Sequence, residues 1–306
     1  FHSSLGLRYL YANLGELQAD AVLREFIITQ RPLDIAEALL AEQPRIVGFG
    51  VYIWNVAETA QVVALLKTVR PELIIVLGGP EVSHEWEKQP MIQMADYLIT
   101  GPGDLVFAQL CRRLLNDDPP TEKIIAAEPL PLDQLALPYR FYTDEDIAHR
   151  LIYVEASRGC PFRCEFCLSA LDQTAWPYPL EPFLAEMEQL YQRGVRHFKF
   201  VDRTFNLNAK VGARILDFFL ERLDERLFLH FELIPDHLPE ALKNRIAQFP
   251  AGTLQFEIGV QTFNPAVQTL ISRKQDNRKT EENLCWLRQN THAHLHADLI
   301  AGLPGE

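Results

Sequence analysis

Two stretches of this 306-residue chain alternate short β-branched runs with amphipathic segments, and a proline-rich segment separates them. Such alternation is typical of βαβ units, in which crossover helices join parallel strands. With 48% apolar residues, the chain is long enough to bury two cores. The sequence therefore predicts an α/β protein with a first domain over residues 1–117, a linker over 118–150 and a second domain over 151–306.

The first domain is expected to form an open parallel sheet with helices on both faces. Strands are predicted over residues 21–29, 45–53, 73–79 and 95–100, and helices over 4–15, 31–43 and 55–70. Asn55, followed three residues later by Glu58, is close to a capping box for the last of these helices. The linker is predicted from its five prolines and mixed charge.

The second domain repeats the alternation and predicts a partial α/β barrel. Strands are expected over residues 151–159, 196–202, 227–233, 254–262 and 294–304, and helices near 180–193, 208–225, 238–248 and 279–290. Five parallel strands stop before a barrel closes. The chain opens on Phe and ends directly after an apolar run, so we expect both ends to be cut from something longer.

Three of the five cysteines, Cys160, Cys164 and Cys167, follow the spacing C-x3-C-x2-C directly after the first strand of the second domain. Loops at the carboxyl ends of parallel strands are where α/β domains place their sites. Three thiolates can hold a soft metal, but they are one ligand short of a closed site. The candidates are an open four-iron cluster, a zinc site completed by a distant histidine, and structural or redox thiols; ligand counting favours the cluster.

The cysteine segment ASRGCPF, with Phe166 directly before the last cysteine, resembles the radical S-adenosylmethionine (radical SAM) superfamily. The resemblance implies that Cys160, Cys164 and Cys167 hold a [4Fe-4S] cluster. It also implies that the open iron binds the amino and carboxylate groups of SAM, and that electron transfer cleaves SAM to a 5′-deoxyadenosyl radical.

Polar residues recur at the ends of the following strands. The segments FELIP, GVQTF and DLIAGLPG resemble the coproporphyrinogen-dehydrogenase-like branch of the superfamily, and FKFVDRTFN places two more polar groups. The residues implied to contact SAM are Phe166, Asp202, Asn206, Glu232, Gln261, Arg273 and Asp298. Any one of them taken alone has a simpler explanation as a cap or solvated turn. Glu257 is given no role, and His294 and His296 are expected to pack or hydrogen-bond rather than ligate.

The first domain, with its flavodoxin-like (Rossmann-type) order and glycines at successive strand ends, resembles the cobalamin-binding domain of cobalamin-dependent radical SAM proteins. The segments LGGPEVS and ADYLITGPGDLVF carry this resemblance. It implies cobalamin contacts at Tyr52, Gly78, Gly79, Gly101 and Gly103. Tyr52 and Trp54 either face the corrin or pack at the sheet edge. The fingerprint D-x-H-x-x-G is absent. The spacing from His2 to Gly6 is one residue longer than in that fingerprint, so His2 is not favoured as a cobalt ligand.

Together these resemblances imply a cobalamin-dependent methyltransferase that acts on an unactivated carbon of a small molecule or peptide. An external donor such as flavodoxin or ferredoxin would supply electrons. Three alternatives stay open: a cobalamin-dependent rearrangement without methyl transfer, a tRNA methylthiotransferase-like enzyme, and a metal-binding module without catalysis. A methylthiotransferase carries further cysteines in its N-terminal domain, where this chain has only Cys111.

Charge and hydropathy argue against two other classes of partner. A net charge of −12 and a pI near 5.3 argue against a broad nucleic-acid surface. No run of about 18 or more apolar residues is present, so no membrane span is expected. The first residues also lack the basic-then-apolar order of a signal peptide, so a cytoplasmic location is expected. An odd number of cysteines predicts reduced thiols or metal ligands rather than disulfides.

Overall fold

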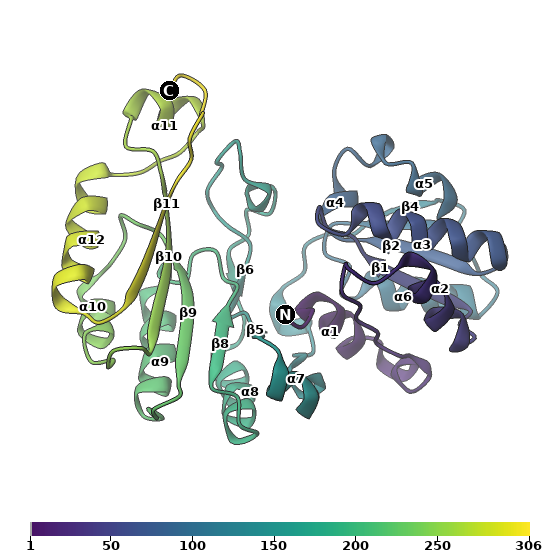
Figure 1. Ribbon diagram of the computed structural model, residues 1–306, viewed down its shortest axis with the longest axis horizontal. Coiled ribbons are helices and arrows are strands. Elements are labelled where there is room, and N and C mark those ends of the chain that lie inside the picture. The colour runs from purple at the N-terminus through teal and green to yellow at the C-terminus, as the bar shows by residue number, and fades with distance from the viewer. Residues whose placement is uncertain (1) are drawn as a thin grey trace. The chain divides into compact units, whose positions relative to one another are not determined.

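The computed structural model describes residues 2–306, which fold into two compact units. One unit is Ser4–Pro138, and the other combines Tyr139–Glu306 with His2 and Ser3. Each unit is built around its own parallel sheet (Figure 1), which confirms the predicted α/β fold. No helix within the described residues is long and apolar enough to cross a membrane.

The first unit has a four-stranded parallel sheet whose spatial order follows the chain. Its strands are β1 (Ile46–Gly50), β2 (Ile74–Gly78), β3 (Tyr97–Thr100) and β4 (Ile124–Ala126). Its α-helices are α1 (Leu5–Ala12), α2 (Pro32–Ala41), α3 (Val56–Val69), α4 (Pro80–Ser83), α5 (Met91–Met94) and α6 (Val106–Leu115). The strand β4 lies within the segment that was predicted to be a linker.

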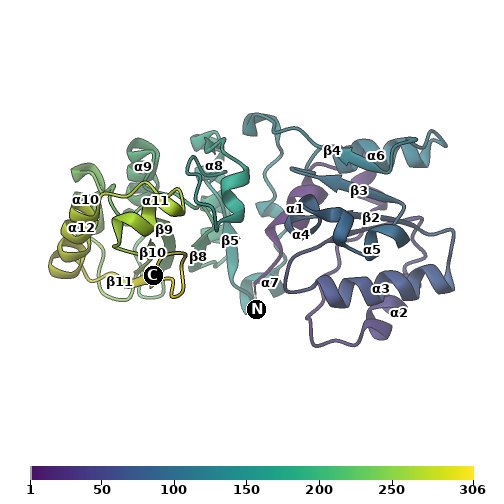
Figure 2. The same cartoon turned by 90° about the horizontal axis from the view of Figure 1, so that it is seen from above.

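The consecutive apolar residues of β2 explain why this sheet is covered on both faces. Ile75 is buried in the same cluster as Val62 and Val63 of α3. Val76 points the other way and is buried with Leu110 of α6. Figure 2 shows α3 and α6 on opposite sides of the sheet. Successive strand side chains alternate between faces, so a continuous apolar run is what such a strand requires.

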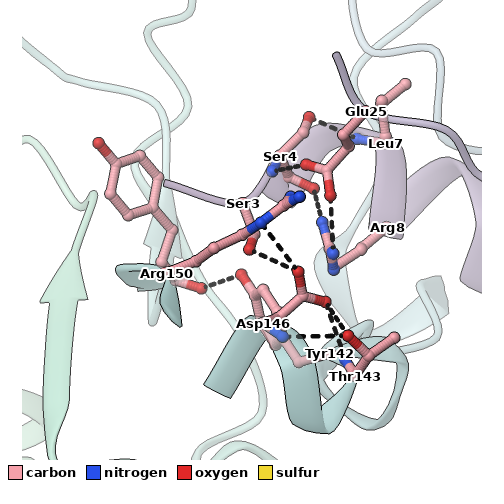
Figure 3. A network of polar contacts seen from close by, with 10 residues as sticks. Ser3, Ser4, Leu7, Arg8, Glu25, Tyr142, Thr143, Asp146 and Arg150 are labelled. Atoms are coloured by element: carbon pink, nitrogen blue, oxygen red, sulfur yellow. Dashed lines mark hydrogen bonds and ion pairs between the residues drawn. The ribbon is translucent and has the colours of Figure 1, made fainter. Parts of the chain in front are cut away.

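The strand predicted over residues 21–29 does not form. This segment pairs with no strand, and Val22 and Ile28 are more than half exposed. Glu25 instead tethers it to α1: it accepts from the backbone N–H of Ser4 and forms an ion pair with Arg8 at 2.9 Å (Figure 3). The segment has the apolar composition of a strand, but pairing also needs a neighbouring sheet edge.

The predicted capping box of α3 is also absent. The Asn55 side chain does not cap the helix. Its oxygen accepts from the N–H of Tyr52 at 2.7 Å, and its amide donates to the carbonyl of Gly50 at 3.0 Å. Asn55 therefore closes the turn that leaves β1. Asx side chains commonly compete for local backbone groups in this way.

The second unit has a five-stranded parallel sheet in the order β11-β10-β9-β8-β5. Its strands are β5 (Ile152–Val154), β8 (His197–Phe200), β9 (Phe228–Leu233), β10 (Leu254–Gln261) and β11 (His294–Leu299). Its α-helices are α7 (Asp144–His149), α8 (Leu180–Gln192), α9 (Ala209–Leu220), α10 (Glu240–Ile246), α11 (Pro265–Leu270) and α12 (Asn277–Asn290). A two-stranded hairpin of β6 (Ser157–Arg158) and β7 (Trp176–Pro177) follows β5.

Helix α7 begins at a capping box, which satisfies backbone groups that would otherwise be unpaired. Thr143 accepts from the N–H of Asp146, and the Asp146 carboxylate accepts from the N–H of Thr143 at 2.8 Å (Figure 3). Ser3 donates a further bond to Asp146 at 3.2 Å. The residues predicted to be a linker thus include a regular helix that belongs to the second unit.

The two faces of the second sheet differ in chemistry. On one face, Phe198, Phe200 and Phe231 are fully buried, and the ring of Phe198 lies 5.1 Å from that of Phe219 in α9. Figure 2 shows α8, α9 and α10 along this face. Most of the alternate residues of the same strands, among them Lys199, His230 and Glu232, are polar and point to the opposite face. We call this opposite face the inward face, because helices cover the outside of an α/β barrel.

Candidate functional site at the cysteine loop

The three cysteines of the motif lie on the loop inside the β6–β7 hairpin, after strand β5. The N–H of Cys160 donates to the carbonyl of Asp172 at 2.8 Å, and that of Cys167 donates to the carbonyl of Cys164 at 3.0 Å. Cys160 and Cys164 are buried, whereas Cys167 is half-buried. Hydrogen bonds within the protein therefore hold the backbone of the cysteine loop.

A second anchor joins the loop to the segment after α11. The N–H of Glu165 donates to the carbonyl of Ile271 at 3.0 Å, and the hydroxyl of Ser272 donates to the Glu165 carboxylate at 2.7 Å. These bonds connect positions that are more than 100 residues apart in the chain. The end of α11 thus fixes the middle of the cysteine motif.

Gly159 is required directly before the first cysteine. Its φ is +90°, a region that side chains rarely adopt. A Cβ atom here would lie 2.6 Å from Thr174 Oγ1 and 2.7 Å from the backbone nitrogen of Ala175. Any larger residue would push the two arms of the hairpin apart.

The thiols are close enough to influence one another electrostatically. Burial raises the pKa of Cys160, the charges of Cys167 and Cys164 raise it further, and the guanidinium of Arg203 opposes this rise. Arg273 Nη1 lies 3.7 Å from Cys164 Sγ. Both guanidinium groups favour the thiolate form that binds iron, whereas burial disfavours it at Cys160.

These residues fit an iron–sulfur cluster by donor chemistry. Three soft sulfur donors gather on one loop, and their charges interact. Among residues 2–306, no three Cys, His, Asp or Glu side chains already stand in a metal-ligating arrangement. The fit is thus one of donor type and loop position, and the thiol rotamers would adjust on binding.

Arg273 and Gln261, both predicted to contact SAM, adjoin Gly259 at the end of β10, and Arg273 also lies next to Cys164. The Arg273 guanidinium donates to the carbonyl of Gly259 and to Gln275 Oε1, the latter at 2.9 Å. Gln261 has a φ of +68° and lies where the pairing of β10 with β11 shifts register. A bulge re-aims side chains at a strand end, so the sheet edge is locally reshaped here.

Glu232 is paired with Arg203, which is not among the site residues predicted from the sequence. Arg203 Nη1 donates to the two carboxylate oxygens of Glu232 at 3.0 and 3.1 Å. The charges of Cys167 and Cys160 also help to raise the Arg203 pKa. One feature of the sequence could have indicated Arg203: in FKFVDRTFN it is a cation directly after a strand and next to Asp202, a predicted site residue.

Asp202 and Asn206 are buried and committed to backbone groups. Asp202 accepts from the N–H of Ala156 at 2.9 Å and from the hydroxyl of Ser157 at 2.6 Å. Asn206 is fully buried, and its amide exchanges hydrogen bonds of 2.8 Å with the N–H and carbonyl of Ile234. Both residues therefore join strand-end loops to each other, and their contact with SAM stays a prediction.

The other predicted SAM contacts are exposed. Asp298 is exposed on β11 and pairs in register with Gly259. Phe166 is 42% exposed on the cysteine loop.

His2 belongs to this second unit: it bridges to Leu151, and its ring stacks on Tyr153 at 4.7 Å. This position gives no support to cobalt ligation by His2.

The predicted cobalamin residues of the first unit lie at the carboxyl ends of its strands. Gly78 ends β2, and Gly101 and Gly103 follow β3. Gly79 has a φ of +110°, and a Cβ there would lie 2.5 Å from the carbonyl oxygen of Val51, so the packing of the β1 and β2 ends alone requires glycine.

The two aromatic residues after β1 stack on each other, Tyr52 half-buried and Trp54 exposed. The rings of Tyr52 and Trp54 stack at 4.6 Å, and Trp54 is 55% exposed. Neighbouring Ile53 is 75% exposed. The loop thus presents a large apolar group at the edge of the sheet where α/β domains take ligands, and both interpretations offered for Tyr52 and Trp54 stay open.

Comparison with known families identifies both units. Residues 1–111 match the B12 binding domain, and residues 154–306, half of the chain, match the Radical SAM superfamily. The chain therefore belongs to the radical SAM superfamily and carries a B12-binding domain, which confirms the resemblances found in the sequence. The cofactor classes of these domains are a [4Fe-4S] cluster with SAM, and cobalamin.

Particular relatives include methyltransferases. The chain is 26% identical over 250 residues to the uncharacterized methyltransferase PH0819 of Pyrococcus horikoshii, with 73% of this chain and 53% of that protein covered. It is 26% identical over 233 residues to the cobalamin-dependent radical SAM methyltransferase TokK of Streptomyces tokunonensis, with 66% and 34% covered. The chain thus spans about half or less of the length of these two relatives.

The structure of the radical SAM methyltransferase TsrM from Kitasatospora setae, solved with cobalamin and a [4Fe-4S] cluster, is similar in fold. The TM-score is 0.74 at 18% identity, and the match covers 100% of this chain and 66% of TsrM. At this identity the likeness supports the fold alone.

Proposed function

We propose that the chain is part of an enzyme that reductively cleaves SAM and transfers a methyl group, with cobalamin as carrier, to an unactivated carbon of a small molecule or peptide. The observation that carries the proposal is the meeting of Cys164, Arg273 and the β10 bulge at the carboxyl end of the parallel sheet. Two relatives of this two-domain chain that are named as methyltransferases, TokK and the uncharacterized PH0819, support it further.

In this proposal Cys160, Cys164 and Cys167 hold the cluster and leave one iron open. When bound, the cluster supplies the electron that breaks a carbon–sulfur bond of SAM, and cobalamin supplies the methyl carrier. The protein's own part is to hold SAM: the Arg273 cation suits its carboxylate, and Gln261 offers hydrogen bonds beside it. Glu232, held by Arg203, is an acceptor for the amino group.

The proposal assigns cobalamin to the first unit. The exposed apolar loop of Ile53 and Trp54 would cover part of the corrin, and the glycine-rich ends of β2 and β3 allow backbone to approach it. Gly78, Gly101 and Gly103 are the positions we assign to that approach. Asp298 and Phe166 are assigned to the SAM side.

The alternatives are less well supported. Cys111 lies in α6, and burial raises its pKa to about 11, so it is a poor cluster ligand and does not favour a methylthiotransferase. A module without catalysis would leave the groups converging on Cys164 unexplained. Rearrangement without methyl transfer uses the same cofactors, and methyltransferase relatives favour the transfer.

Two further assignments belong to the proposal. The open cluster must be reduced from outside, so we expect an electron donor of the flavodoxin or ferredoxin type. A reducing compartment keeps such thiols available, and we accordingly place the protein in the cytoplasm.

Anaerobic reconstitution with iron and sulfide tests the proposal. The chain should take up about four irons and cleave SAM to 5′-deoxyadenosine or S-adenosylhomocysteine when reduced. Cys164→Ala should lose both properties. Cys285→Ala, which changes an exposed cysteine outside the motif, should retain them. Stoichiometric zinc without iron, or SAM cleavage that survives Cys164→Ala, would contradict the assignment.

A further inference from the structure

The inward face of the second sheet carries two aligned rows of polar side chains. The first row is Tyr153, Lys199, His230, Gln255 and His294, each the register partner of the next. The second row is Glu232, Glu257 and His296. The sequence shows the same pattern as alternation in HFKF, LHFEL and QFEIG, where the intervening aromatic residues point to the helices.

Polar rows of this kind do not stabilise the interior of a barrel. The inward positions of parallel barrels are ordinarily filled by branched aliphatic residues. Taking ionisable groups out of water costs free energy unless each is paired, and even then apolar residues often serve stability better. Two successive polar rows therefore indicate a surface that binds a ligand.

The rows have a charged centre at Glu257. Glu257 Oε1 accepts from His230 Nε2 at 2.8 Å and from Lys199 Nζ at 3.3 Å, and Glu257 Oε2 lies 3.4 Å from the same ammonium. His230 is 8% exposed, Lys199 17% and Glu257 31%. One cation and one anion thus stand side by side on a surface that is only partly open to water.

Both charges have bonding capacity left for a ligand. Across residues 2–306, Glu257 is the one group within hydrogen-bonding distance of the Lys199 ammonium, which has three N–H donors. The Glu257 carboxylate can accept about four bonds, more than it receives here. Burial and the Lys199 charge lower the pKa of His230, and the same causes lower that of His197, so these imidazoles add no cation at neutral pH.

We infer that the inward face binds the zwitterionic head of an amino-acid-like substrate, whose carboxylate pairs with Lys199 and whose ammonium pairs with Glu257. A ligand with one charge would be attracted by one of these groups and repelled by the other, whereas a zwitterion complements both. The inference rests on the proposed function in placing the substrate in the barrel of the second unit.

Thermal shift with matched ligands tests this inference on the full chain reconstituted with iron, sulfide and cobalamin and saturated with SAM, whose amino and carboxylate groups then occupy the open iron. The probes are the standard L-amino acids, each beside its decarboxylated amine and its deaminated acid. At least one amino acid should raise the melting temperature, and both of its partners should bind at least about tenfold more weakly, since each lacks one charge-assisted bond. If no amino acid binds better than both partners, the inference is wrong.

Variants then assign the two charges. The Lys199→Met protein should bind the amino acid no better than its amine. The Glu257→Gln protein should bind the amino acid no better than its deaminated acid. Lys199→Arg keeps the cation and should restore part of the preference, and the exposed Lys279→Met should match the unaltered chain. Retained discrimination in a Lys199→Met protein with an unchanged circular dichroism spectrum would overturn the assignment.

A failure of the substrate inference can be told apart from a failure of the proposed function. SAM cleavage is measured independently on the same protein by release of 5′-deoxyadenosine or S-adenosylhomocysteine. Cleavage without amino-acid preference removes only the substrate assignment, whereas loss of cluster and cleavage removes the proposed function itself.

Discussion

Asp202 is the buried carboxylate on which the base of the cysteine loop depends. Burial raises its pKa to about 7, although the bonds from Ser157 and Ala156 favour the charged form. Because the folded-state pKa lies above the unfolded value, the stability that Asp202 contributes is present at low pH and is lost as the pH rises toward and through 7.

Asp202→Asn should therefore destabilise the protein more at pH 5 than at pH 8, by about 1–3 kcal/mol at the lower pH. Urea unfolding at both pH values measures this difference. Asp224→Asn is the matched control, since the pKa of Asp224 is lowered and its contribution is complete at both pH values. An Asp202→Asn penalty that is equal at the two pH values would contradict this account.

Arg203 should tune the reduction potential of the bound cluster. Its cation interacts with Cys160 and Cys167 and pairs with Glu232. A nearby positive charge favours the reduced, more negative cluster, so Arg203→Gln should lower the midpoint potential by on the order of tens of millivolts. Spectroelectrochemical titration of the reconstituted protein without SAM gives this value.

Comparison variants decide whether charge is the cause of such a shift. Arg203→Lys should stay close to the unaltered protein, and Glu232→Gln should shift the potential in the opposite direction. The exposed Arg226→Gln serves as a distant control. Equal potentials for Arg203→Gln and the unaltered protein would show that the cluster does not sense this cation.

The β6–β7 hairpin is the element that positions the cysteine motif. Gly159→Ala would place a Cβ against Thr174 and Ala175, so we expect iron content per chain to fall by more than half while the five-stranded sheet stays folded. Gly194→Ala, at a φ of +103° with no atom within 4 Å of the new Cβ, should cost about 1–2 kcal/mol of stability but keep full iron. Iron analysis and thermal unfolding distinguish the two.

At the scale of elements, periodicity predicted most of the sheets. Strands β1, β2 and β3 of the first unit and all five strands of the second unit's parallel sheet lie within predicted ranges, because their apolar patterns match burial on one or two faces. The strand over 21–29 failed because its pairing depends on a neighbour that composition does not reveal. The three residues of β4 were too few to stand out from a proline-rich segment.

The cysteine motif of the candidate site could be predicted from the sequence, but the roles of its other residues could not. The spacing of Cys160, Cys164 and Cys167 is local, so the sequence displays it directly. The roles of Asp202 and Asn206 depend on which loop groups they meet, and those partners lie 28 to 46 residues away. No role for Glu257 can be predicted from the sequence, because its partners, Lys199 and His230, lie on other strands.

At the scale of the whole molecule, the first unit should retain cobalamin. Incubation of the chain with hydroxocobalamin followed by desalting should leave about one cobalamin per chain, read by visible absorbance. Trp54→Ala removes the exposed ring and should lower retention several-fold. Val69→Ala, an equally exposed apolar residue at the far end of α3, should not. A colourless protein in every case would leave only the radical SAM assignment.

The two-sided character of the second sheet has a consequence for how such enzymes diversify. Its cohesion comes from aromatic rings on the helix side, among them Phe198, Phe200 and Phe231, which are buried independently of what occupies the inward face. Inward residues can therefore be exchanged in succession while the scaffold persists. A lineage built in this way can acquire new substrates through single substitutions, because selection for folding and selection for specificity act on alternate positions of the same strands.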